Sequence, residues 1–184
     1  NTAVKDALGN STVMEYDANG NLISQTDRNG ATTTYTYDAL NRLTRTTDAL
    51  GQVTEYAYDT VGNLVETTTP EGHETTSEYD SLNRAISTTD ALSRVTGYEY
   101  DSLGRMTKTT YADGTSVSYT YDANGRVLTA TDEMGGVITY TYDANGQMLT
   151  STDPMGGVTS YPYDAVGNVL TEKTPMGFVT SYSY

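Results

Sequence analysis

Apolar and aromatic residues recur along the chain at a fixed spacing of 21 residues, with no insertion or deletion. The dipeptide Tyr-Asp marks each copy, and we number every repeat from that tyrosine as position 1. Position 7 is apolar in every complete copy, from Leu22 to Val169, and position 20 is usually a second tyrosine. The chain is therefore an array of about nine copies of one unit. The marker residues, which we predict to be the structural positions of the repeat, are Tyr16, Asp17, Tyr37, Asp38, Tyr58, Asp59, Tyr79, Asp80, Tyr100, Asp101, Tyr121, Asp122, Tyr142, Asp143, Tyr163 and Asp164.

Two turn signals divide each repeat into two short segments. Asp-x-x-Gly stands at positions 2–5 and again at positions 12–15, as in residues 122–125 and 153–156. An aspartate side chain can accept a hydrogen bond from a backbone N–H two residues on, and glycine permits the left-handed conformation that closes such a turn. The segments between the turns are rich in Thr, Val, Leu and Tyr, which favour strands. The pattern predicts an all-β array of antiparallel β-hairpins and no helix.

The tyrosines at positions 20 and 1 are two residues apart, as Tyr140 and Tyr142 illustrate. Side chains two apart on a strand project from the same face of a sheet. Consecutive hairpins would then align tyrosines in rows with a large area to bury. Because aliphatic residues are scarce, we expect these rows to form the core of the array.

Composition and charge narrow the functions that the array could serve. Lys and Arg together number 10 against 24 Asp and Glu, so the formal net charge is −14. A chain this acidic, without a basic cluster, is not expected to bind nucleic acid. There is no cysteine, and His73 is the one histidine, so cysteine ligation and multi-histidine metal sites are excluded. No apolar run approaches the length of a membrane span.

The repeat resembles the Rhs / YD-repeat (tyrosine-aspartate repeat) family. That family's unit is roughly Tyr-Asp-x-x-Gly-Arg-Leu, followed by Thr-Asp-x-x-Gly and Tyr-x-Tyr-Asp, and residues 100–106 and 121–127 match it most closely. The resemblance covers the whole chain. It implies a long antiparallel sheet that coils into a spiralling, β-solenoid-like wall. In that family such walls enclose toxin domains or form large parts of cell-surface proteins such as teneurins.

The aspartates are the main candidates for chemistry. Fourteen of the 15 fall at position 2 or position 12, where they could bind calcium or cap turns. Two strands per repeat place like aspartates about 10 Å apart, too far to share one ion. We therefore interpret them as turn caps, and we expect no metal or cofactor and no catalytic residue.

Two further motifs have an ordinary explanation beside a functional one. Asp153-Pro154-Met155-Gly156 resembles the aspartic autoprotease motif that ends some Rhs shells, but it stands at the usual turn position and another repeat follows it. Arginine recurs at position 6, four residues after a turn aspartate, which indicates a local ion pair in the turn. The arginines are Arg42, Arg84, Arg105 and Arg126.

We interpret residues 1–184 as a single YD-repeat array, an uncapped segment of a longer chain. The leading hypothesis is a non-enzymatic structural role in the wall of an extracellular or cell-surface tube or fibre. Its partners would be the neighbouring repeats of the same chain or further copies joined by self-association. Two alternatives stay open: a piece of an Rhs-type shell that encapsulates a toxin domain, and an adhesin that binds surface glycans.

Overall fold

The computed structural model describes residues 2–5 and 11–184, and the turn predicted from Asp6 to Gly9 lies outside this part. The chain divides into two compact units, Asn1–Val95 and Thr96–Tyr184. Every regular element in the described residues is a β-strand, which confirms the all-β prediction. No helix suited to crossing a membrane was found in that part of the chain.

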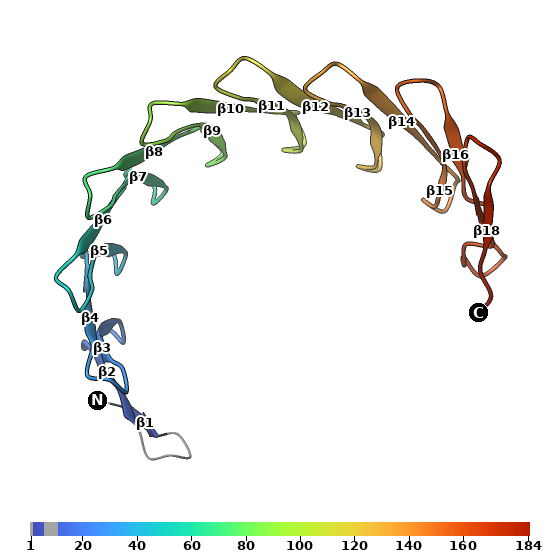
Figure 1. Cartoon of the computed structure of the whole chain (residues 1–184). Coiled ribbons are helices and arrows are strands. Elements are labelled where there is room, and N and C mark those ends of the chain that lie inside the picture. Colours follow the sequence, from blue (N-terminus) through green and yellow to red (C-terminus); the bar gives the residue numbers. More distant parts are fainter. Residues whose placement is uncertain (1, 6–10) are drawn as a thin grey trace. The chain divides into compact units, whose positions relative to one another are not determined.

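The described residues of the first unit form nine strands that pair in the order of the sequence (Figure 1). Each strand is antiparallel to the one before it, so the unit is a series of hairpins. The strands are β1 (Thr2–Lys5), β2 (Ser11–Tyr16), β3 (Leu22–Thr26), β4 (Thr32–Tyr37), β5 (Leu43–Thr47), β6 (Val53–Tyr58), β7 (Leu64–Thr68), β8 (Glu74–Tyr79) and β9 (Ala85–Thr89).

The second unit repeats this plan, and its strands also pair antiparallel in sequence order. The last three strands are shorter than their counterparts, with three residues each. The strands are β10 (Val95–Tyr100), β11 (Met106–Thr110), β12 (Ser116–Tyr121), β13 (Val127–Thr131), β14 (Val137–Tyr142), β15 (Met148–Thr152), β16 (Val158–Ser160), β17 (Thr171–Lys173) and β18 (Val179–Ser181).

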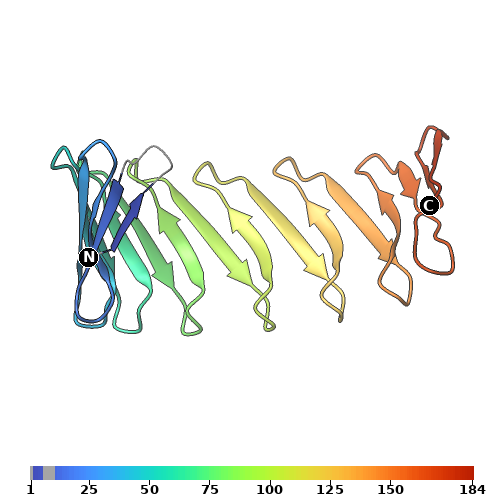
Figure 2. The same ribbon diagram turned by 90° about the horizontal axis from the view of Figure 1, so that it is seen from below.

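Tight turns join the strands, and they alternate between the two ends of the strands (Figure 2). We call those that start at position 2 the Tyr-Asp turns and those that start at position 12 the Thr-Asp turns. In the Tyr-Asp turn after β4, the Asp38 N–H donates to the Arg42 carbonyl at 2.9 Å, and the Asn41 N–H donates to the Asp38 carbonyl at 3.0 Å. Asn41 has φ of 60°, so it takes the left-handed conformation that glycine supplies in most other copies.

A β-bulge follows seven of the Tyr-Asp turns in the described residues, and the sequence pattern did not reveal it. Between β4 and β5, Tyr37 pairs with Leu43 but Thr36 pairs with Arg45, so Thr44 is the extra residue. Residues that pair directly across two strands share a face. The bulge therefore keeps Leu43, at position 7, on the same face as Tyr37 and restores regular alternation beyond it.

The expectation that tyrosine rows form a core is wrong. In the described residues no hydrophobic side chain is fully buried, and Thr109 alone, 9% exposed, counts as buried. Tyr35 and Tyr37 are half-buried on their face, whereas Thr36 between them is exposed on the other. The described residues of each unit form a single sheet without a second layer on either face, so packing along the sheet covers the rings only in part.

Candidate functional site

The carboxylates of the Tyr-Asp turns are held by the backbone of their own turn. Asp38 Oδ1 accepts the N–H groups of Leu40 at 2.9 Å and of Arg42 at 3.0 Å. All eight position-2 aspartates accept from the N–H groups two and four residues on. The bond to the Arg42 N–H, aided by the guanidinium, lowers the pKa of Asp38. These aspartates cap turns, as predicted.

Six position-1 tyrosines tie their repeat to the one before it. The Tyr58 hydroxyl donates to the backbone carbonyl of Leu43, 15 residues earlier, at 2.9 Å. The same bond, from position 1 to the position-7 carbonyl of the preceding repeat, recurs at Tyr37, Tyr79, Tyr121, Tyr142 and Tyr163. Burial raises the pKa of Tyr37 and of Tyr142, so their hydroxyls keep the proton that they donate.

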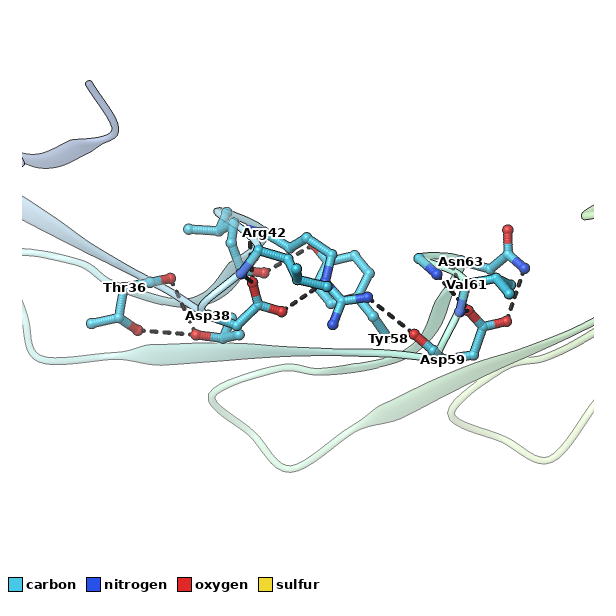
Figure 3. A network of polar contacts seen from close by, with 11 residues as sticks. Thr36, Asp38, Arg42, Tyr58, Asp59, Val61 and Asn63 are labelled. Atoms are coloured by element: carbon cyan, nitrogen blue, oxygen red, sulfur yellow. Dashed lines mark hydrogen bonds and ion pairs between the residues drawn. The ribbon is translucent and has the colours of Figure 1, made fainter. Parts of the chain in front are cut away.

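Position-6 arginines make a second tie, toward the following repeat (Figure 3). Arg42 Nε donates to Asp38 Oδ2 in its own turn at 2.6 Å, and its Nη1 donates to the carbonyl of Asp59 in the next turn at 3.0 Å. The guanidinium carbon also lies 4.8 Å from the ring centroid of Tyr58, within cation–π range. One side chain thus touches the aspartate of its own turn and both marker residues of the next.

The same arrangement recurs in the second unit. Arg105 donates to the carbonyl of Asp122 at 2.8 Å and lies over Tyr121 at 4.6 Å. Arg126 donates to the carbonyl of Asp143 at 3.0 Å and lies over the ring at position 1 of that repeat at 4.8 Å. The sequence predicted a local ion pair at position 6, and the structure adds an inter-repeat contact. These arginines are half-buried, with 26% of the side chain exposed, rather than solvated.

The Thr-Asp turns have the same backbone geometry. Asp153 Oδ1 accepts from the N–H of Met155 at 2.9 Å and of Gly157 at 2.7 Å, so the Asp-Pro-Met-Gly motif is an ordinary turn. At Thr69 a threonine replaces the aspartate. Its hydroxyl oxygen accepts a hydrogen bond from the His73 backbone N–H at 3.3 Å. His73 itself is exposed. The Arg94–Asp90 pair resembles the position-6 pairs locally, but 64% of the Arg94 side chain is exposed.

The side chains that could ligate a metal are dispersed over the described residues. No group of three or more Asp, Glu, His or Cys side chains gathers there in a way that could hold a metal ion. Open grooves do lie between consecutive Thr-Asp turns, and the one between residues 48–52 and 69–73 is lined in part by Arg45, Glu55 and Glu71. The groove is open, and apolar side chains such as Leu50 and Val53 line it beside the charged ones.

Sequence reasoning identified the repeating residues but not the ties between repeats. A signal for them was present: tyrosine at position 1 and arginine at position 6 recur together, although either alone has a local explanation. The distance from Tyr58 to Leu43 depends on the bulge and on strand pairing, which the residue pattern does not reveal.

Antiparallel hairpins of one repeating unit, tied from repeat to repeat by position-1 tyrosines, define a β-hairpin repeat protein. The family model for the teneurin YD-shell matches residues 2–168. The chain belongs to this family, which confirms its identification as a YD-repeat protein. No curated protein matches it.

Solved structures show the same fold. The structure of TcdB2-TccC3-Cdc42 has a TM-score of 0.57 at 15% identity, and that of TcdB2-TccC3-TEV a TM-score of 0.55 at 16% identity. The Photorhabdus luminescens Tc holotoxin pore has a TM-score of 0.54 at 16% identity. In all three the match covers 94% of this chain and 12% of the other, so this chain spans about an eighth of the chains that it resembles.

Proposed function

We propose that the chain is a non-enzymatic segment of the wall of a secreted or surface-displayed YD-repeat protein. The observation that supports this most directly is the double tie between repeats, formed by the position-1 hydroxyl and the position-6 side chain. The polar groups that recur in every copy hold turns and join neighbouring hairpins. Residues 1–184 then form one continuous array of about nine repeats within a longer wall.

Two forms of such a wall have support. The match to the teneurin YD-shell model and the likeness to TcdB2-TccC3 favour a closed shell, whose cargo would be a toxin domain outside this sequence. The uniform period of 21 residues favours a regular tube or fibre, because every junction presents the same backbone geometry. In either form the partner of each repeat is the next repeat.

Electron microscopy of the full-length native protein tests the proposal and separates its two forms. Hollow particles of uniform size would establish the shell, and filaments with a regular axial repeat would establish the tube or fibre. A compact particle without a continuous wall would overturn the structural proposal.

A glycan-binding adhesin is a second candidate, favoured by the open grooves between Thr-Asp turns. Binding there would depend on Arg45 and Glu55, which line the groove and pair across β5 and β6. A glycan array probed with the native chain and with R45A would show hits that the variant loses. An array without hits above background would remove this candidate and leave the wall proposal intact.

A further inference from the structure

Side chains of neighbouring Tyr-Asp turns meet in pairs, and the two members of a pair vary together. One member is the position-6 residue of a repeat, and the other is the position-5 residue of the next repeat. We call the two residues a junction pair. Asn21 and Asn41 form such a pair: Asn21 Nδ2 donates to Asn41 Oδ1 at 2.8 Å. Asn63 and Asn83 form another, with the same bond at 3.1 Å.

Junction pairs with arginine are built differently. The Arg42 guanidinium extends past position 5 of the next turn to reach the Asp59 carbonyl, and position 5 there is Gly62. A Cβ added at Gly62 would lie 4.0 Å from Arg42 Nη1, an ordinary van der Waals contact, so the guanidinium lies directly beside position 5. The spacing is tighter in the second unit, at 3.9 Å for Gly125 with Arg105 and 3.6 Å for Gly146 with Arg126.

The glutamine junction follows the arginine form. Gln147 Nε2 donates to the backbone carbonyl of Gly167 at 3.2 Å, and a Cβ added at Gly167 would lie only 2.9 Å from that nitrogen. A long position-6 side chain is thus followed by glycine, whereas a short asparagine is followed by a second asparagine. Within each unit no junction in the described residues departs from this pattern.

The position-5 asparagines are not explained by the backbone alone. Asn41 and Asn83 both have φ of 60°, a left-handed conformation that glycine adopts at less cost. Their side chains must therefore contribute something that glycine cannot. In Asn41 that contribution is an amide oxygen that accepts from both Asn19 and Asn21, at 3.0 and 2.8 Å.

We propose that the junction pairs of the first unit, where glycine and asparagine alternate at position 5, are a matching rule that disfavours stacking a repeat on the copy beyond its neighbour. Nearly identical hairpins could otherwise pair with the wrong neighbour during folding. Skipping one repeat would set Asn21 against Gly62, so its amide would lose the Asn41 oxygen and keep only Asp17 Oδ2. It would also set Arg42 against Asn83, whose side chain would compete with the guanidinium for the space beside position 5. The rule goes beyond the proposed function, because it holds whether the wall closes as a shell or extends as a fibre.

The test is a double-substitution cycle at the first junction in the intact chain, with N21R, N41G and N21R/N41G. Native-state hydrogen exchange of the Asp38 amide, which donates to the Arg42 carbonyl, reports opening of that turn. With Asn21 in place, we expect N41G to speed exchange of the Asp38 amide. In the N21R background, we expect N41G to slow it. The effect of N41G on the exchange rate should therefore differ by about fivefold or more between the two backgrounds. Any benefit of glycine in the left-handed conformation cancels in this comparison.

Two further experiments protect the conclusion. The reciprocal cycle uses R105N, G125N and R105N/G125N. In the double variant, the turn amides should exchange more slowly than the combined effects of the two single substitutions predict. S93G is the control, because Ser93 is a left-handed residue, with φ of 59°, in a Thr-Asp turn. Its effect on amide exchange should be the same with and without N21R. If N41G changes exchange by the same factor in both backgrounds, or if S93G shows equal coupling, the matching rule is wrong. Either result would leave the wall proposal standing.

Discussion

The hydroxyl tie between repeats predicts a specific difference between two tyrosines on the same strand of the sheet. Tyr58 ends β6 and donates to the Leu43 carbonyl of the preceding repeat at 2.9 Å. Tyr56, two residues earlier, is also half-buried on that face, yet no hydrogen bond of its hydroxyl appears in the part of the chain that the structure describes. The substitutions Y58F and Y56F remove the same atom from neighbouring sites.

The structure sets the magnitude of the expected loss. A single neutral hydrogen bond contributes about 1 kcal/mol to folding, and Y58F leaves the ring in place beneath Arg42. We therefore expect Y58F to lower the free energy of unfolding by about 1 kcal/mol, and Y56F by less than about 0.5 kcal/mol. Tyr37 and Tyr79 make the same bond in the same unit. Because distant sites add, the triple variant should lose about 3 kcal/mol.

Equilibrium urea unfolding of the intact chain, followed by circular dichroism, measures these differences. Stability in a repeat array is close to a sum of repeat and interface contributions, so a lost interface bond should lower the urea midpoint. Hydrogen exchange of the turn amides around Asp59 then locates the loss at the junction. Equal destabilisation by Y58F and Y56F would refute the inference that the position-1 hydroxyl joins repeats.

Three other predictions follow from the turn geometry. R42K keeps the charge but cannot span from Asp38 to the Asp59 carbonyl or stack on Tyr58, so urea unfolding should show a loss of about 1–2 kcal/mol, and R94K a smaller loss. The Arg42 N–H holds the pKa of Asp38 below its ordinary value of 3.8, so its stabilisation is complete above that value and is lost as pH falls through the folded pKa. Thermal melts should be flat from pH 7 to about 5 and drop steeply below about 4, and a melting temperature independent of pH down to 3 would contradict the capping role. Calcium titration should leave the melting temperature unchanged, because the turn amides already occupy Asp38 Oδ1 and Arg42 Nε occupies Oδ2, and a rise would reveal a cation site.

Local chemistry made much of this fold readable from the sequence. The turn at residues 38–42 could be predicted because aspartate and a left-handed residue have fixed roles at fixed spacing. The bulge at Thr44 could not be predicted, because it depends on the register in which β4 and β5 pair, and no residue type marks it. The Tyr58–Leu43 bond depends in turn on that pairing.

The prediction of a tyrosine core was wrong for a related reason. Alternation correctly placed Tyr35 and Tyr37 on one face, but whether a face is covered depends on a second layer. The expectation for position 6 was incomplete in a similar way. Four-residue spacing indicated the Arg42–Asp38 pair, whereas the contact to Asp59 requires knowing which turn lies beside it.

The hairpins that follow one another in sequence order also determine how such a wall responds to mechanical force. The backbone hydrogen bonds that join the strands point along the direction in which the hairpins succeed one another. Tension in that direction therefore breaks the hydrogen bonds of one pair of strands at a time. Each repeat of 21 residues then releases about 70 Å of extended chain. The wall should yield in even steps at low force, with the position-1 and position-6 ties as the points of resistance.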